Sequence, residues 1–184
     1  MRAVVLHPIT DRTAAARDPE DALDEAVSLA AALALDVRAA RVVPVPRRRA
    51  ATLFGTGKVE EIAALVADEE AGLVIVDGAL TPVQQRNLER AWKAKVLDRT
   101  GLILEIFGDR ARTREGVLQV ELAHLSYQKS RLVRSWTHLE RQRGGFGFLG
   151  GPGETQIEAD RRALDERIAR IREALARSVR TRDQ

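Results

Sequence analysis

Leu73-Val74-Ile75-Val76 is the stretch that decides the fold, because it is a run of four apolar residues with no polar residue between them. A half-exposed strand alternates apolar and polar residues, whereas this run predicts a strand buried on both faces, as in parallel sheets covered by helices. A helical pattern at 58–70 precedes it. After it, Thr81-Pro82-Val83-Gln84 has the spacing of a capping box and predicts a second helix start.

The same alternation extends outward over the first hundred residues. Three further short strands are expected at 3–6, 42–45 and 95–97. Pro44 places the second of these near a sheet edge or a bend, because proline cannot donate to a ladder. Asp18 and Pro19 predict the N-cap and first position of a helix. From this order we expect an α/β domain over residues 1–108, with a parallel sheet flanked by helices.

Strand signals stop after Asp98, and a different pattern follows. We expect a helix at 100–107, a long helix from Thr113 toward His138, and another opened by a capping box at Thr155-Gln156-Ile157-Glu158. Heptad-like seams run along both long helices through Leu118, Leu122, Leu125, Leu132, Trp136 and Leu139, and through Ile157, Leu164, Ile168, Ile171 and Leu175, interrupted by Lys129 and Arg161. The spacing predicts an antiparallel coiled-coil helical hairpin over residues 109–184.

The two long helices are joined by Gly144–Gly153, which reads Gly-Gly-Phe-Gly-Phe-Leu-Gly-Gly-Pro-Gly. Each glycine costs a helix interior roughly 1 kcal/mol relative to alanine, so this segment is expected to be a loop. Its bulky apolar residues favour insertion into an RNA or protein cleft over local packing of the tip. The predicted RNA-binding residues are Arg110, Arg112, Arg114, Arg141, Arg143, Gly144, Gly145, Phe146, Gly147, Phe148, Leu149, Gly150 and Gly151.

Gly55-Thr56-Gly57-Lys58 resembles part of a phosphate-binding loop but lacks two required residues. Thr52 stands where the first glycine is needed, and Val59 stands where a serine or threonine ligates magnesium. The favoured interpretation is a tight turn into a helix, with Gly55 or Gly57 adopting special backbone angles. Weak anion binding by Gly55, Gly57 and Lys58 at that helix start is left open.

Composition limits the remaining possibilities. The net charge is +3 with a sequence pI near 9.8, and the absence of cysteine excludes disulfides and thiol catalysis. The three histidines lack metal-ligand spacing, so no metal site and no catalytic residue is predicted, although Asp77 and Asp98 follow strands. Arg47-Arg48-Arg49 is interpreted as a solvated charge run, with phosphate contact as the alternative. With no window long enough to span a membrane, we expect a cytoplasmic monomer.

Five ordered blocks resemble the N-terminal region of the ribosome-associated GTPases of the HflX family. The blocks are Gly55–Ile62, Leu80–Glu89, Val96–Phe107, Arg110–Gly116 and Gly150–Glu158. The resemblance implies an α/β domain and a helical hairpin, followed by a GTPase domain that would begin near Gln184, where this chain stops. GTP, Mg²⁺ and GTP hydrolysis are expected in that absent domain, and this chain alone is not expected to be an enzyme.

The resemblance also implies binding to the rRNA of the large ribosomal subunit near the peptidyl transferase centre, in ribosome splitting or rescue. The segment Gly144–Gly153 matches the loop that reaches that centre in the family. Two alternatives stay open on the residues themselves. One is a regulatory α/β domain that binds ATP or GTP through Lys58, and the other is a coiled-coil module for protein interaction.

Overall fold

The structure of the chain, a computed structural model, describes residues 1–11, 17–143 and 154–183, and the side chains of 131–160 lie outside the described part. It divides into two compact units, Met1–Ile106 and Phe107–Gln184, and each is treated by itself.

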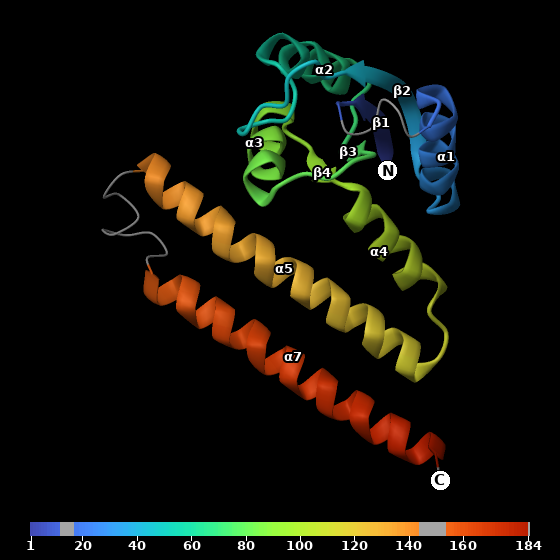
Figure 1. Cartoon of the computed structure of the whole chain (residues 1–184), viewed down its shortest axis with the longest axis vertical. Helices are drawn as coiled ribbons and strands as arrows, with labels where there is room; N and C mark the ends of the chain where they lie inside the picture. Colours follow the sequence, from blue (N-terminus) through green and yellow to red (C-terminus); the bar gives the residue numbers. More distant parts are fainter. Residues whose placement is uncertain (12–16, 144–153, 184) are drawn as a thin grey trace. The chain divides into compact units, whose positions relative to one another are not determined.

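The first unit is an α/β fold built on a four-stranded parallel sheet (Figure 1). Its elements in chain order are β1 (Arg2–Ile9), α1 (Pro19–Ala32), β2 (Asp36–Pro44), α2 (Thr56–Asp68), β3 (Leu73–Val76), α3 (Pro82–Trp92), β4 (Lys95–Leu97) and α4 (Arg99–Arg110), the last of which runs across the division. The strand order is β2-β1-β3-β4, so β2 is an edge strand, as Pro44 indicated. The predicted parallel sheet with flanking helices is confirmed.

Helices cover both faces of this sheet and form two apolar cores. Val4 and Leu6 of β1 pack on the face covered by α2 and α3, in a core that includes Ile62 and Leu88. The alternate residues of β1 pack on the face covered by α1 and α4, in a core that includes Leu23, Ala26 and Leu102. All four residues of β3 are buried, which confirms that the run at 73–76 is covered on both sides.

Local signals set the helix starts of this unit. The Asp18 carboxylate accepts a hydrogen bond from the Glu20 backbone N–H at 2.8 Å, and Pro19 occupies the first helical position of α1. Thr81 and Gln84 form the predicted capping box of α3. These caps satisfy backbone N–H groups that a helix start otherwise leaves without partners.

Two strands are longer than the sequence predicted. We expected strand 3–6 to stop before His7 and Pro8, but β1 continues to Ile9 because its neighbour β2 pairs with it through Pro44. β2 begins at Asp36 rather than at 42, because its first half alternates polar and apolar residues instead of forming a β-branched run. That alternation is the ordinary pattern of a partly exposed edge strand.

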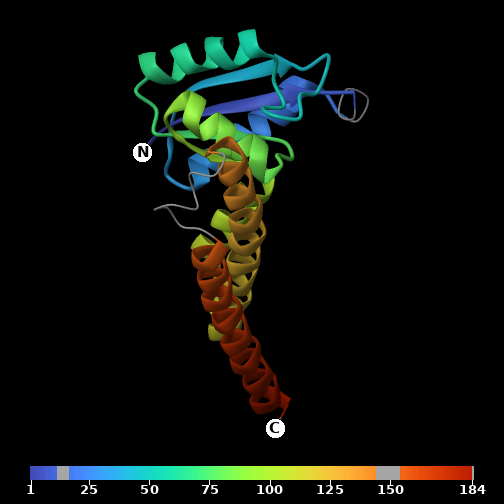
Figure 2. The same ribbon diagram turned by 90° about the vertical axis from the view of Figure 1, so that its left-hand side faces the viewer.

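The second unit contains two long helices, α5 (Arg114–Arg143) and α7 (Glu154–Asp183), which lie side by side in Figures 1 and 2. Leu125, Ile168 and Ile171 are buried between them. Ion pairs join Glu115 to Arg182, Glu121 to Arg167, and Lys129 to Asp165. The numbers of the partners run in opposite directions, so the helices are antiparallel.

The detailed predictions for the seam and the helix start of this pair are confirmed only in part. The predicted seam residues Leu118, Leu122, Leu164 and Leu175 are partly buried against the central three, whereas the side chains of Leu132, Trp136, Leu139 and Ile157 lie outside the described part. The capping box at Thr155 is wrong, because α7 already begins at Glu154 and Thr155 lies inside it. A regular coiled-coil geometry stays a prediction.

Candidate functional site

Most of the predicted RNA-binding residues fall within 144–151, outside the described part of the chain. Residues 144–153 are not described, so the prediction for the tip glycines, phenylalanines and Leu149 is not tested. Arg141 and Arg143 belong to the last turn of α5, but their side chains are not described either. These residues therefore remain candidates on sequence grounds alone.

The three remaining candidates, Arg110, Arg112 and Arg114, are described and exposed. Arg112 Nη1 donates to the Asp109 carbonyl oxygen at 3.0 Å, which holds its guanidinium near the turn between α4 and α5. Arg114 is the first residue of α5 and lines a surface hollow of about 440 Å³. All three positive charges thus face solvent at the end of the helix pair where α5 begins.

The structure adds basic residues to this end that the sequence reading left out. Arg177 and Arg182 of α7 line the same hollow as Arg114. Arg182 is held by the Glu115 carboxylate at 3.3 Å, whereas the described residues offer no acidic partner to Arg114 or Arg177. The sequence did contain a signal for Arg177 and Arg182, because antiparallel pairing of the two predicted seams places the end of α7 beside the start of α5. We call Arg110, Arg112, Arg114, Arg177 and Arg182 the basal arginine cluster.

The predicted anion site at Gly55, Gly57 and Lys58 lies at the start of α2. Gly55 is the N-cap with φ −65° and ψ 157°, which any residue adopts, and a Cβ added at Gly55 or Gly57 would meet no atom within 4 Å. The expectation that these glycines supply special backbone angles is therefore wrong for Gly55, and Gly57 has no left-handed angle either. The N-cap makes no side-chain hydrogen bond, and the first turn of α2 holds no acidic residue.

This helix start does not fit GTP with magnesium. Val59, which stands where a phosphate loop places its magnesium-ligating hydroxyl, is buried and carries no oxygen. Lys58 Nζ is already 3.1 Å from the Glu61 carboxylate. Anion binding here stays a prediction, and no phosphate-transfer chemistry is assigned to it.

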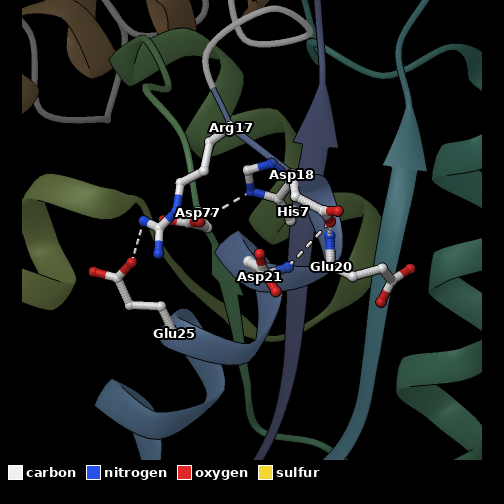
Figure 3. A network of polar contacts seen from close by, with 7 residues as sticks. All are labelled: His7, Arg17, Asp18, Glu20, Asp21, Glu25 and Asp77. Carbon is white, nitrogen blue, oxygen red and sulfur yellow. Dashed lines mark hydrogen bonds and ion pairs between the residues drawn. The ribbon is translucent and has the colours of Figure 1, made fainter.

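A polar network that the sequence did not reveal lies at the carboxyl ends of β1 and β3 (Figure 3). His7 Nδ1 lies 2.9 Å from Asp77 Oδ2, and the two side chains are only 10% and 11% exposed. A carboxylate can only accept, so this contact places a proton on Nδ1 and fixes the orientation of the imidazole. Arg17 and Glu25 form an ion pair beside it on the side of α1. The connection that leaves β1 leads to β2 on one side of it, and the next connection leads to β3 on its other side. Open α/β sheets place ligands at such a reversal of the strand order.

A cavity of about 280 Å³ opens beside the network, between α1 and α4. Its walls combine the polar groups His7, Arg17, Glu25, Asp77 and Arg99 with apolar ones, Ala22, Ala26, Leu29, Leu102 and Ile103. Covalent catalysis with a histidine–aspartate pair also needs a serine, threonine or cysteine. None lines this cavity among the described residues, so the pair orients the imidazole without forming a catalytic triad.

Asp98, the other strand-end carboxylate, has a structural role. It is 3% exposed, and its Oδ1 accepts from the Gly101 backbone N–H at 3.0 Å, which caps the start of α4. The described residues contain no group of three or more acidic or histidine side chains that could hold a metal ion. No helix in the described part of the chain has the length and apolar character needed to cross a membrane.

Comparisons with known proteins place these features in a family. Residues 20–108 match the sequence model of the "GTP-binding GTPase N-terminal" region, and residues 110–184 match that of the "GTP-binding GTPase Middle Region". A relative in Magnetococcus marinus, named GTPase HflX, is 58% identical over 160 residues, covering 87% of this chain and 37% of the relative. The GTPase HflX of Escherichia coli K12 is 51% identical over 171 residues, covering 91% of this chain and 39% of the relative. The chain thus spans about two fifths of the length of these relatives.

Solved structures show the same fold. A crystal structure titled SsGBP in complex with GDP matches with a TM-score of 0.69 over 100% of this chain and 46% of that one, at 20% identity. A GTP-binding protein of Sulfolobus solfataricus in complex with GDP matches with a TM-score of 0.64 over 98% of this chain and 46% of that one, at 21% identity. At these identities the likeness concerns the fold alone.

Proposed function

This chain belongs to the HflX family of GTPases and corresponds to its N-terminal and middle regions, and from that premise we propose that it binds the large ribosomal subunit. In this proposal it contacts rRNA near the peptidyl transferase centre, as part of a protein that splits or rescues ribosomes. The names of these relatives say only that they are GTPases, so the ribosomal partner is proposed from the residues of this chain and from the family resemblance.

The observation that carries the proposal is the pair of antiparallel helices α5 and α7, which has the exposed basal arginine cluster at one end. α5 has 30 residues, and at 1.5 Å rise per residue it is about 45 Å long. The helix pair therefore separates the basal arginine cluster from Arg143 and Glu154, and the sequence places Phe146 and Phe148 between those two residues. Exposed arginines that bind phosphates, combined with aromatic rings that stack on unpaired bases, are the recurrent pair of contacts in RNA recognition.

Co-sedimentation of the chain with purified large ribosomal subunits tests this proposal. We expect the chain to pellet with large subunits and to be displaced as salt rises, because phosphate contacts release bound counterions. A chain that stays in the supernatant at low salt with large subunits in excess would refute it.

GTP hydrolysis is proposed only for the family's GTPase region and not for residues of this chain. Since the start of α2 does not fit GTP with Mg²⁺, the described residues offer the reaction no phosphate loop. We expect the chain itself to show no GTPase activity in a phosphate-release assay.

A regulatory ligand site is the second candidate function, and the cavity beside His7 and Asp77 is the observation that favours it. Isothermal titration with ATP and GTP tests the nucleotide version. Heat at millimolar nucleotide that is lost on Arg99→Gln places the ligand in this cavity, whereas loss on Lys58→Gln places it at the start of α2. Titration without heat rejects both.

A further inference from the structure

The arginine run Arg47-Arg48-Arg49 occupies the connection between β2 and α2, and the proposed function has not used it. All three residues are exposed. On sequence grounds the run is a solvated charge cluster, which would need only a flexible loop. The structure shows instead a loop whose backbone is fixed from several sides.

Three groups of contacts fix this loop. Arg49 and Leu53 exchange two backbone hydrogen bonds of 3.0 and 2.8 Å. Two side chains of α3 hold the same backbone, with Gln84 Nε2 donating to the Arg49 oxygen at 2.8 Å and Asn87 Nδ2 donating to the Ala51 oxygen at 2.9 Å. Beyond the turn, Phe54 is fully buried and its ring lies 6.0 Å from that of Trp92.

The charges on this fixed loop are mostly uncompensated. Arg48 pairs with the Asp11 carboxylate at 3.0 Å. For Arg47 and Arg49, the parts of the chain that the structure describes contain no ion pair. The loop leads directly into the first turn of α2, which also contains no acidic residue. The local surface therefore carries an excess of positive charge in a defined geometry.

We propose that Arg47 and Arg49 form a second RNA-contact surface, which binds backbone phosphates of structured rRNA independently of the hairpin tip. This inference rests on the proposed ribosome binding and adds a contact made by the α/β unit. A guanidinium matches two phosphate oxygens with two parallel hydrogen bonds. A loop that is already ordered loses less conformational entropy on binding than a flexible one.

The chemistry of the loop favours RNA phosphates over a protein partner. Protein interfaces depend on a central apolar or aromatic anchor. The exposed large apolar residues in the described part of the chain are Met1, Ile103, Phe107 and Val117, and none belongs to this loop. The exposed residues beside the arginines are Pro46, Ala50 and Ala51, whose small side chains let a phosphate backbone approach closely but offer no aromatic or large apolar anchor.

The test compares two double variants with equal loss of charge. Arg47→Gln with Arg49→Gln removes the proposed contacts and keeps the backbone bridge, and Arg48 is left in place because it pairs with Asp11. Arg41→Gln with Lys95→Gln is the control, since both residues are exposed, on strands β2 and β4 of the same unit, and neither forms an ion pair in the described part of the chain. Binding to a fluorescent RNA hairpin oligonucleotide is measured by anisotropy over a KCl series, with thermal melting by circular dichroism as the folding control.

We expect the loop variant to bind the RNA hairpin about tenfold more weakly at low salt, with the slope of log K against log[KCl] reduced by about 1 to 2. The control variant should change much less, and both should melt like the parent chain. A loop variant that binds like the parent or like the control overturns the inference, as does a parent chain that does not bind the hairpin.

Parallel pelleting with large subunits separates this inference from the proposed function. If the parent does not pellet but the loop variant still loses RNA affinity, ribosome binding is refuted while the phosphate contact stands. If all three chains pellet and bind RNA equally, the loop inference is overturned while ribosome binding stands. If the loop variant loses subunit binding but keeps its affinity for the RNA hairpin, the loop contacts a ribosomal protein, which also overturns the inference.

Discussion

At the scale of single residues, the His7–Asp77 pair is the strongest test of the α/β unit. Asp77→Asn keeps the shape of the side chain but removes the acceptor charge from a pair whose side chains are almost buried. We expect a loss of about 1 to 3 kcal/mol in the free energy of unfolding, measured by urea denaturation. Asp11→Asn, in a pair with an exposed carboxylate, is the control and should change it by less than about 1 kcal/mol. Equal losses of unfolding free energy in the two variants would show that the buried pair stabilises the unit no more than the exposed pair does.

Gly57 gives a second prediction at this scale. A Cβ added there meets nothing within 4 Å, and the residue lies in helical conformation. Gly57→Ala should therefore raise the free energy of unfolding by about 0.5 kcal/mol, because alanine has fewer unfolded conformations to lose. The matched comparison is Gly78→Ala, where the new Cβ would lie 3.2 Å from a ring carbon of Pro8 and should not stabilise. Destabilisation by Gly57→Ala would contradict the open space seen at this position.

Single residues were predictable from sequence only where their partners are local. The caps made by Asp18 and Thr81 were predicted because each bonds to groups two or three residues away. The His7–Asp77 contact joins residues 70 positions apart, and nothing in the local pattern marks it. The sequence indicates this contact only indirectly. His7 and Asp77 each follow an apolar run, and adjacent parallel strands bring the ends of those runs together.

At the scale of elements, Leu125→Ala tests the packing of α5 against α7. Leu125 is 3% exposed and belongs to the small core of the second unit. Because removing a buried leucine side chain leaves a cavity, we expect a cost of about 2 to 4 kcal/mol to that unit. Loss of helical circular dichroism at 222 nm on heating measures it. Val117→Ala on the same helix, at a position 46% exposed, is the control and should leave the melting curve nearly unchanged; similar losses in both variants would contradict the packing.

Element types followed from the sequence more readily than element bounds. The strand at 73–76 was predicted with its correct limits because its continuous apolar run ends sharply, and the strand at 95–97 also has the predicted limits. The bounds of β1 and β2 were missed, since Pro8 and the charged residues of an edge strand interrupt an apolar run without ending the ladder. The second helix of the hairpin was found by its seam, while its start was misplaced by two residues, since an N-cap at Thr155 predicts a first helical residue at Gln156 and α7 begins at Glu154.

At the scale of the whole molecule, affinity for the large subunit should depend strongly on salt. The basal arginine cluster and the Arg47–Arg49 loop together offer several exposed guanidinium groups. If about four of them contact phosphates, affinity should fall by roughly two orders of magnitude between 50 and 200 mM KCl. Pelleting over a salt series measures this fall. A flat response would show that phosphate contacts contribute little to binding.

The order of elements was predictable at this scale, whereas the site was only partly so. Parallel topology follows from alternating strands and helices, which is a property of the sequence. Which arginines share a surface depends on contacts between distant helices, and Arg177 and Arg182 were missed because the pairing of the two seams was not followed to the end of α7. The part of the predicted site at 144–153 rests on sequence and resemblance, and mutation must test it.

The most direct measurement of the central claim is the affinity of the chain for purified large ribosomal subunits, with and without Phe146→Ala and Phe148→Ala together. We predict that the parent chain pellets with the subunits and that the double variant binds them at least about tenfold more weakly, while its helical circular dichroism is unchanged, as expected if each ring stacks on an RNA base. Equal pelleting of the two chains, or no pelleting of the parent at low salt, would contradict the account.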